Sequence, residues 1–128
     1  MDDCYNSNPE AVKETLKTFM AVARRKHKIA VLGDMLELGE LSGKSHRELG
    51  KIVSSLGFEY LIGVGRAAKE TVETAKEKMG TRRVKAVAAE NQVDRRLKKY
   101  LKEGNAILIK GSHSVGLEKL VLRLQKSI

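Results

Sequence analysis

The chain has 128 residues, a length typical of one domain built around a single core. Hydrophobic residues make up 41% of it and charged residues 32%, which excludes a disordered chain, and a single proline with 4% aromatic residues disfavours a loop-rich β-sandwich. Lysine and arginine outnumber the acidic residues by 25 to 16, and the net charge of +9 raises nucleic-acid binding as one hypothesis.

Short apolar runs alternate along the chain with amphipathic stretches. The runs are too brief for helices and rich in branched side chains, as buried parallel strands are, whereas the stretches repeat apolar residues every three or four positions, as helices do. In chain order the pattern predicts a helix over residues 12–23, a strand over 29–32, a helix over 49–56, a strand over 60–64, a helix over 68–79, a strand over 84–88, a helix over 93–101, a strand over 106–109 and a helix over 117–124. This alternation predicts the α/β class, with a doubly wound, mostly parallel sheet covered by helices on both faces.

Two of the predicted helices carry capping signals. Asn8 followed by Pro9 predicts an N-cap and a first helical residue, and Asn91 is a candidate cap for the fourth helix. The first helix begins so early that the strand expected before it is missing or reduced to a stub. We therefore expect residues 1–128 to be a single domain of a longer protein.

Targeting signals and metal clusters are not visible in the sequence. The N-terminus lacks the basic segment and apolar stretch of a secretory signal, and no apolar run approaches the ~18 residues that a membrane span requires. The sequence therefore predicts a soluble, intracellular protein. Cys4 is the only cysteine, and His27, His46 and His113 are scattered, so we expect no metal site built from these side chains alone.

Glycines mark three places where a predicted strand ends, in segments 33–35, 63–66 and 110–114. Ligands of open α/β sheets bind beyond the carboxyl ends of the strands, and glycine lets the backbone approach a ligand closely. These corners are therefore candidate site positions. The alternative is that the glycines only turn tight corners between strand and helix.

One motif resembles part of a phosphate-binding P-loop. Gly43-Lys44-Ser45 matches the end of that loop, but the motif requires glycine at position 38, which is Leu38. The triplet also lies about ten residues beyond the predicted strand, too far for the strand-loop-helix context of the motif. We interpret it as a polar loop at a helix start.

A second motif is a more serious competitor. Residues 63–68 match the dinucleotide fingerprint, follow a predicted strand, and have Glu90 as the acid further along. The fingerprint normally lies on the first strand of its fold, and Glu90 lies beyond the usual ~20-residue spacing. A free-standing dinucleotide-binding or basic nucleic-acid-binding module is therefore kept as the alternative function.

Three further segments carry a family resemblance. They are residues 3–9 (Asp-Cys-Tyr-Asn-Ser-Asn-Pro), residues 31–39 (Val-Leu-Gly-Asp-Met-Leu-Glu-Leu-Gly) and residues 110–114 (Lys-Gly-Ser-His-Ser), the last followed by Glu118. In this order they resemble the C-terminal domain of the Mur ligases, in particular the members that add D-alanyl-D-alanine. The resemblance implies a Rossmann-like domain of a three-domain cytoplasmic enzyme of peptidoglycan synthesis, whose UDP-substrate domain and central ATPase domain lie outside this chain.

The resemblance also implies a reaction and its participants. ATP phosphorylates the carboxylate of UDP-N-acetylmuramoyl-tripeptide, the amine of D-alanyl-D-alanine attacks the acyl phosphate, and the Mg ligands belong to the central domain. The implied nucleotide-binding residues are Asp3, Tyr5, Asn6 and Asn8, and the implied substrate-binding residues are Asp34, Lys110, Ser112 and His113. No catalytic or metal-binding residue is implied in this chain, so the isolated domain is expected to be inactive. Cys4 and His113 depart from the family pattern, which has serine and arginine there.

The chemistry of these candidates differs from one position to the next. Asp34 suits the dipeptide's ammonium and has no obvious partner nearby in sequence, whereas Ser112 with the N–H groups of the last helix suits its carboxylate. Lys110 is either a substrate contact or a lysine whose stem snorkels to solvent. For His46 a surface or packing role stands beside substrate contact, and Glu37 is interpreted as serving the polar start of a helix.

The basic residues gather in two segments, 24–28 and 95–102. Both flank or lie on predicted helices, with almost no aromatic residue to stack on bases, which is typical of solvated helix faces rather than of a nucleic-acid groove. We therefore expect neither a nucleic-acid partner nor a membrane span.

Overall fold

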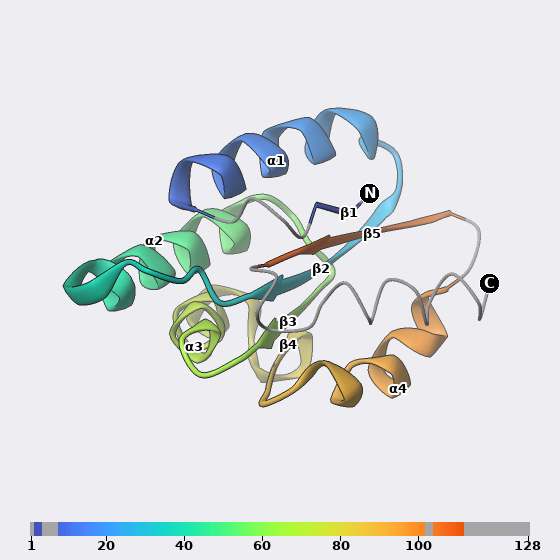
Figure 1. Cartoon of the computed structure of the whole chain (residues 1–128). Helices are drawn as coiled ribbons and strands as arrows, with labels where there is room; N and C mark the ends of the chain where they lie inside the picture. Colours follow the sequence, from blue (N-terminus) through green and yellow to red (C-terminus); the bar gives the residue numbers. More distant parts are fainter. Residues whose placement is uncertain (1, 4–7, 102–103, 112–128) are drawn as a thin grey trace.

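The computed structural model describes residues 2–3, 8–101 and 104–111, and within them the strands form one parallel sheet in the order β1-β5-β2-β3-β4 (Figure 1). The strands are β1 (Asp2–Asp3), β2 (His27–Gly33), β3 (Tyr60–Val64), β4 (Val84–Val87) and β5 (Asn105–Lys110). The strand expected before the first helix is present as a two-residue stub, which pairs with Ile109 and Lys110 of β5.

The described helices lie on both faces of the sheet, and Figure 1 shows α1 and α4 on opposite sides of it. They are α1 (Pro9–Val22), α2 (Ser42–Ser55), α3 (Ala68–Met79) and α4 (Asp94–Leu97), with 3-10 turns η1 (Gly39–Leu41), η2 (Thr81–Arg83), η3 (Glu90–Gln92) and η4 (Lys98–Tyr100). From β1 to β4 each crossover moves the same way across the sheet, whereas the connection from β4 to β5 runs back. Because parallel crossovers are right-handed, α1 to α3 share one face and α4 covers the other.

Each face of the sheet buries its own apolar cluster. The first cluster packs α1, α2 and α3 on the sheet and includes Val12, Leu16, Phe19, Leu49, Val53, Val72, Ala75, Leu32, Leu61 and Leu108. The second lies under α4 and includes Ile29, Val31, Ile62, Val64, Ile109, Val93 and Leu97. Residues of β2 alternate between the two clusters because successive strand side chains point to opposite faces. The predicted doubly wound α/β fold is confirmed.

The start of α1 forms as its sequence predicts. Asn8 is the N-cap, its Oδ1 accepting a hydrogen bond from the Ala11 N–H at 2.9 Å, and Pro9 is the first helical residue. The side chain satisfies one of the N–H groups that a helix start leaves without an intrahelical partner.

The prediction for the fourth helix is wrong in its extent and in its cap. Asn91 does not cap α4, because it lies inside η3, and Val93 precedes the four-residue helix. Gln92 determines the local structure instead: its Oε1 accepts hydrogen bonds from the N–H groups of Ala88 and Ala89 at 2.9 and 3.0 Å. The chain continues as a 3-10 turn beyond Leu97. The predicted helix over residues 117–124 lies outside the described residues.

Gly43, Lys44 and Ser45 lie within the first turn of α2, which begins at Ser42. The polar loop that we predicted there is therefore helical, and the triplet does not form a phosphate-binding loop between a strand and a helix. Glu37, interpreted as part of a helix start, lies in the loop between β2 and η1 with a positive φ of 62°.

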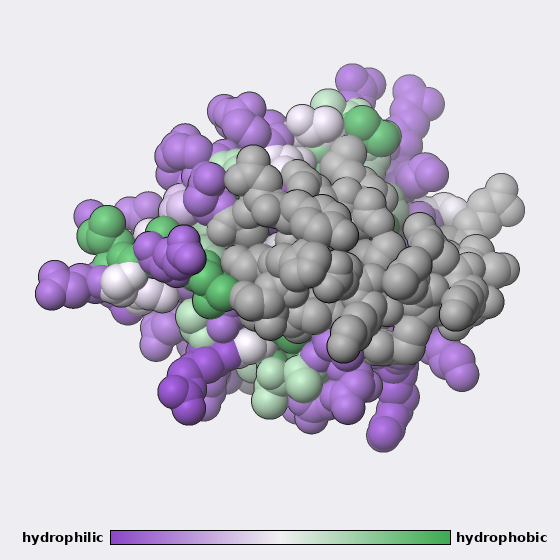
Figure 2. All heavy atoms as spheres, in the orientation of Figure 1, coloured by the Kyte–Doolittle hydropathy of each residue, from purple (hydrophilic) through white to green (hydrophobic). Residues whose placement is uncertain are grey.

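The surface seen in Figure 2 is mostly hydrophilic where described residues are visible. Among the described residues the large exposed hydrophobic side chains are Val22, Leu36 and Leu41. Scattered exposed apolar residues of this kind are normal on a folded domain. In the part of the chain that the structure describes, no helix is both long enough and apolar enough to span a membrane.

Candidate functional site

β2 and β5 are neighbours in the parallel sheet, so their carboxyl ends lie side by side at one edge. Open α/β sheets bind ligands beyond the carboxyl ends of their strands. Two sequence-predicted substrate residues lie here, Asp34 directly after β2 and Lys110 at the end of β5, whose register partner in β2 is Leu32.

Asp34 is a buried carboxylate, with 8% of the residue exposed. Its Oδ1 accepts a hydrogen bond from the backbone N–H of Ala68, the first residue of α3, at 2.7 Å. Within the described part of the chain no other hydrogen bond or ion pair reaches this carboxylate, so Oδ2 has no partner there. A cation or a hydrogen-bond donor is the kind of partner that a buried carboxylate oxygen accepts.

Gly65 makes the close approach to Asp34 possible. Its φ is +113°, a value that other residues rarely adopt, and a Cβ at this position would lie 2.5 Å from Asp34 Oδ1. Gly63 has a separate packing role, because a Cβ there would lie 2.5 Å from Val72 Cγ2 of α3. The two glycines therefore seat α3 against the sheet and against the Asp34 carboxylate.

This arrangement disfavours the dinucleotide interpretation of residues 63–68. In that fingerprint the N–H groups at the helix start receive a pyrophosphate. Here the Ala68 N–H already donates to Asp34, and the negative charge of the carboxylate would repel a phosphate at the same place.

His46 lies beside the same loop and is fully buried, with 0% exposed. Its Nε2 accepts a hydrogen bond from the Met35 N–H at 3.0 Å, and its Nδ1 lies 2.8 Å from the carbonyl oxygen of Ser42. Of the roles weighed from the sequence, the geometry supports packing. The signal was present in the spacing, because His46 precedes the buried residues Leu49, Gly50 and Val53 by three, four and seven positions and so lies on the buried face of α2.

Lys110 is also buried, with 1% exposed, so the snorkelling interpretation is wrong. By the alternation of β5 it lies on the same face of the sheet as Leu108, the face that α1 covers. No ion pair joins it to Asp34 in the described part of the chain. The carboxylate of Asp34 and the buried side chain of Lys110 therefore come from neighbouring strands at the same edge of the sheet.

The remaining predicted site residues are only partly described. The Asp3 backbone pairs with Lys110 across β1 and β5, which brings Asp3 to the same edge of the sheet as Asp34. Asn8 is the α1 cap described above. Tyr5, Asn6, Ser112 and His113 lie outside the described residues. Within the described ranges no group of three or more His, Cys, Asp or Glu side chains is arranged to hold a metal ion.

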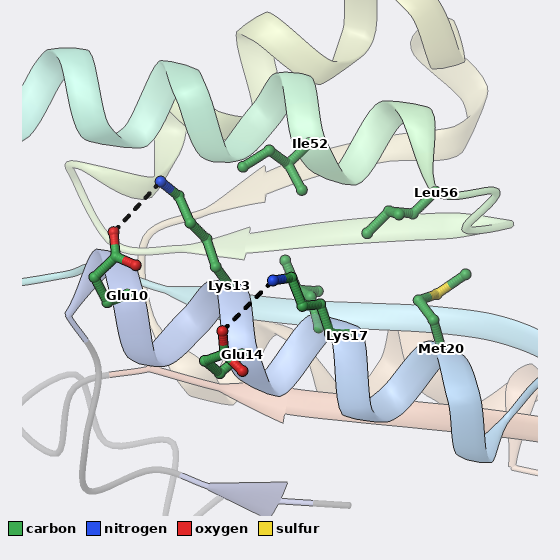
Figure 3. Close-up of a pocket in the computed structure, with 8 residues that line it drawn as sticks. Glu10, Lys13, Glu14, Lys17, Met20, Ile52 and Leu56 are labelled. Carbon is green, nitrogen blue, oxygen red and sulfur yellow. Dashed lines mark ion pairs between the residues drawn. The ribbon is translucent and has the colours of Figure 1, made fainter.

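A hollow of about 500 Å³ lies between α1 and α2. In Figure 3, Ile52 and Leu56 of α2 lie opposite Met20 of α1. Two ion pairs of α1 flank them, Glu10 with Lys13 and Glu14 with Lys17, each at 3.6 Å. The described residues that we predicted for nucleotide or substrate do not line this hollow.

Comparison with known protein families shows which family this chain belongs to. Over residues 1–113 the sequence matches the model of the family described as "Mur ligase, glutamate ligase domain". The chain belongs to this family, and the resemblance drawn from its three segments is confirmed.

The individual proteins that are similar to this chain share one name. Proteins named UDP-N-acetylmuramoyl-tripeptide--D-alanyl-D-alanine ligase are similar to this chain: that of Bacillus subtilis is 28% identical over 127 residues, with 99% of this chain and 28% of the relative covered. That of Treponema pallidum is 32% identical over 126 residues, covering 97% of this chain and 27% of the relative. The chain thus spans less than a third of the length of these curated relatives.

Solved structures confirm the fold. MurF from Acinetobacter baumannii superposes with a TM-score of 0.82 at 24% identity, covering 97% of this chain and 27% of that one. MurF ligase from Thermotoga maritima, solved in complex with ADP, has a TM-score of 0.75 at 24% identity and covers 98% of this chain and 28% of that one.

Proposed function

We propose that this chain is the C-terminal domain of an ATP-dependent ligase that joins D-alanyl-D-alanine to UDP-N-acetylmuramoyl-tripeptide in the cytoplasmic synthesis of peptidoglycan precursors. Its family membership and the names of its relatives support this reaction. The relatives are more than three times as long as the matched region, which leaves room for the UDP-substrate and central ATPase domains. The isolated domain is proposed to be inactive, because the phosphoryl transfer takes place on the central domain.

The Asp34 carboxylate, of which only Oδ1 has a partner among the described residues, carries the proposal for the substrate. D-alanyl-D-alanine is a zwitterion, and its ammonium would occupy the Oδ2 side of a buried carboxylate whose Oδ1 is held by Ala68. A charge-assisted hydrogen bond of this kind is about twice as strong as a neutral one. Lys110 supplies the opposite charge at the same edge, and Ser112 and His113 are proposed as further contacts of the dipeptide.

The chain's part in the reaction is to bind and orient. ATP transfers a phosphoryl group to the tripeptide carboxylate and leaves as ADP, which gives an acyl phosphate. The dipeptide amine, once it has lost a proton to the solvent, attacks the acyl carbon, and the tetrahedral intermediate expels phosphate to form the amide. Asp34 fixes the direction from which the amine approaches. Holding two reactants in the right orientation raises the rate of the reaction between them. Asp3, Tyr5, Asn6 and Asn8 are proposed to face the nucleotide across the domain cleft, and any Mg ligands belong to the central domain.

Steady-state kinetics of the whole ligase test the proposal. Asp34→Asn should raise the KM for D-alanyl-D-alanine by about 10-fold to 100-fold, the cost of removing a charged partner from a hydrogen bond, and leave the KM for ATP nearly unchanged. Glu37→Gln, which removes an exposed acid of the same loop, is the matched control and should change neither value. Equal effects of Asp34→Asn on both substrates, or ATP turnover by residues 1–128 alone, would contradict the proposal.

A further inference from the structure

The loop that follows β2 is tied to two helices at consecutive residues. Asp34 accepts the Ala68 N–H of α3, and the Met35 N–H donates to Nε2 of His46 in α2. The backbone direction at Asp34 is therefore set by bonds on both sides of the peptide that joins it to Met35. Both ties are buried, so water does not readily replace either of them.

The Met35 bond requires one tautomer of His46. A backbone N–H only donates, so Nε2 must carry no proton, and the ring proton of the neutral imidazole lies on Nδ1. Nδ1 then donates to the carbonyl oxygen of Ser42 at 2.8 Å. Both ring nitrogens are used in the neutral form.

A third hydrogen bond joins α2 directly to α3. The Thr71 hydroxyl of α3 donates to the carbonyl oxygen of His46 at 2.9 Å, which links the two helices that hold the loop. Gly50 allows these helices to approach closely, because a Cβ there would lie 2.5 Å from the Thr71 carbonyl oxygen. The loop, α2 and α3 are thus each bonded to the other two.

We propose that His46 is a positioning residue for Asp34: by holding the Met35 N–H, its Nε2 aims the second carboxylate oxygen of Asp34 at the ammonium of the amine substrate. This inference rests on the proposed function of Asp34. Without an acceptor at Nε2 the buried Met35 N–H is left unsatisfied, and the loop must shift to reach water or another acceptor. Because Asp34 precedes Met35 directly, its carboxylate moves with that shift.

Two substitutions separate positioning from packing. His46→Gln places an amide oxygen near the position of Nε2 and keeps an acceptor for Met35, whereas His46→Leu fills similar space and accepts nothing. Val53→Ala is the control, because Val53 lies on the same helix with 0% exposed and its truncation lowers stability without removing a partner of Met35.

The first readout uses the 128-residue chain itself. In the nitrogen-15 spectrum of His46, Nδ1 should carry the proton, and the Met35 amide should exchange slowly with solvent. His46→Gln should keep most of that protection, and His46→Leu should lose about tenfold or more of it, the worth of one buried hydrogen bond. A protonated Nε2, or equal protection in both variants, would overturn the inference.

The second readout is the KM for the amine substrate in the whole ligase. His46→Leu should raise it about tenfold with the KM for ATP unchanged, and His46→Gln should recover most of that loss. If His46→Leu does not fold, His46→Asn replaces it, since its shorter side chain reaches only the Nδ1 position. An equal rise in Val53→Ala would overturn positioning. A normal amine KM in Asp34→Asn would instead overturn the proposed function, so the two failures are distinguishable.

Discussion

The carboxylate of Asp34 caps the start of α3 from a distance of 34 residues along the chain, through the hydrogen bond to the Ala68 N–H. The residue in the N-cap position of α3, Ala67, has no side chain that accepts a hydrogen bond, so the acceptor comes from the loop after β2. One carboxylate therefore stabilises a helix start with Oδ1 and presents Oδ2 at the carboxyl edge of the sheet.

Gly65→Ala should damage both purposes at once. The new Cβ would meet the Asp34 carboxylate at 2.5 Å in a backbone with φ of +113°, so we expect a loss of unfolding free energy of about 3 kcal/mol from strain and overpacking together. Gly57→Ala is the matched control, because its φ is +81° and nothing lies within 4 Å of the added Cβ. It should lose only about 1 kcal/mol, the backbone cost alone.

Urea denaturation of the two glycine variants measures the difference. Equal losses would show that Gly65 is needed only for its backbone angle and that the carboxylate can move aside. In the whole ligase, Gly65→Ala should also raise the KM for the amine substrate, whereas Gly57→Ala should not.

The repeating parts of the fold could be predicted because burial imposes a period on the sequence. Strands with both faces covered leave continuous apolar runs, and β2 and β3 formed where such runs lie. The fourth helix was predicted too long because its apolar period does not distinguish an α-helix from the 3-10 turn into which the chain passes at Lys98. Its cap was missed because the Gln92 side chain accepts the hydrogen bonds of the preceding turn, and periodicity does not report them.

The position of the candidate site could be predicted for a similar reason. The corners that hold Asp34 and Lys110 were predicted because the ends of parallel strands meet at one edge, whereas the two residues themselves were named from the family resemblance. The partner of Asp34 could not be, since it is a backbone N–H of Ala68 and any residue except proline supplies one. Gly65, the glycine of that corner, was noted in the sequence as part of a phosphate-binding fingerprint. The sequence alone does not distinguish a glycine that makes room for a carboxylate from one that makes room for a phosphate.

Two glycines within α2 should respond to alanine in opposite directions. At Gly50 the added Cβ would lie 2.5 Å from the Thr71 carbonyl oxygen and 2.9 Å from Thr74 Cβ, so Gly50→Ala should force α2 and α3 apart and cost about 2 kcal/mol. At Gly43 the nearest atom, at 2.9 Å, is the flexible end of Arg47. Gly43→Ala should therefore gain about 0.5 to 1 kcal/mol from helix propensity. Thermal unfolding of both variants checks the signs, and a loss in Gly43→Ala would contradict the packing argument.

Tyr60 predicts a change of stability in alkaline solution. Burial raises its pKa above the ordinary value of 10.0, Arg96 acts in the opposite direction, and Tyr100, whose ring stacks on it at 5.4 Å, raises it further. Below pH 10 the phenol is neutral in both states and its contribution is fully present. As the pH rises through the folded-state pKa, the unfolded chain ionises first and that stability is lost.

Comparison with Tyr60→Phe isolates this effect, because the variant keeps the ring and removes the ionising group. The difference in unfolding free energy between the two proteins, measured at about pH 8 and again at about pH 11, should shift in favour of Tyr60→Phe at the higher value. A constant difference would mean that the phenol ionises equally readily in the folded and unfolded chain.

Asn8 tests whether a helix cap can also serve a nucleotide. Asn8→Ala should lower the unfolding free energy by about 1 kcal/mol, because the Ala11 N–H loses its acceptor, whereas Asn8→Asp should keep the cap and most of the stability. In the whole ligase the proposed contact with ATP should respond differently, because the negative charge of an aspartate repels the triphosphate. Asn8→Asp should therefore raise the KM for ATP while its melting temperature stays near that of the parent protein. If only Asn8→Ala changes the KM for ATP, in proportion to its lost stability, Asn8 acts as a cap alone and the nucleotide contact must come from other residues of the same segment.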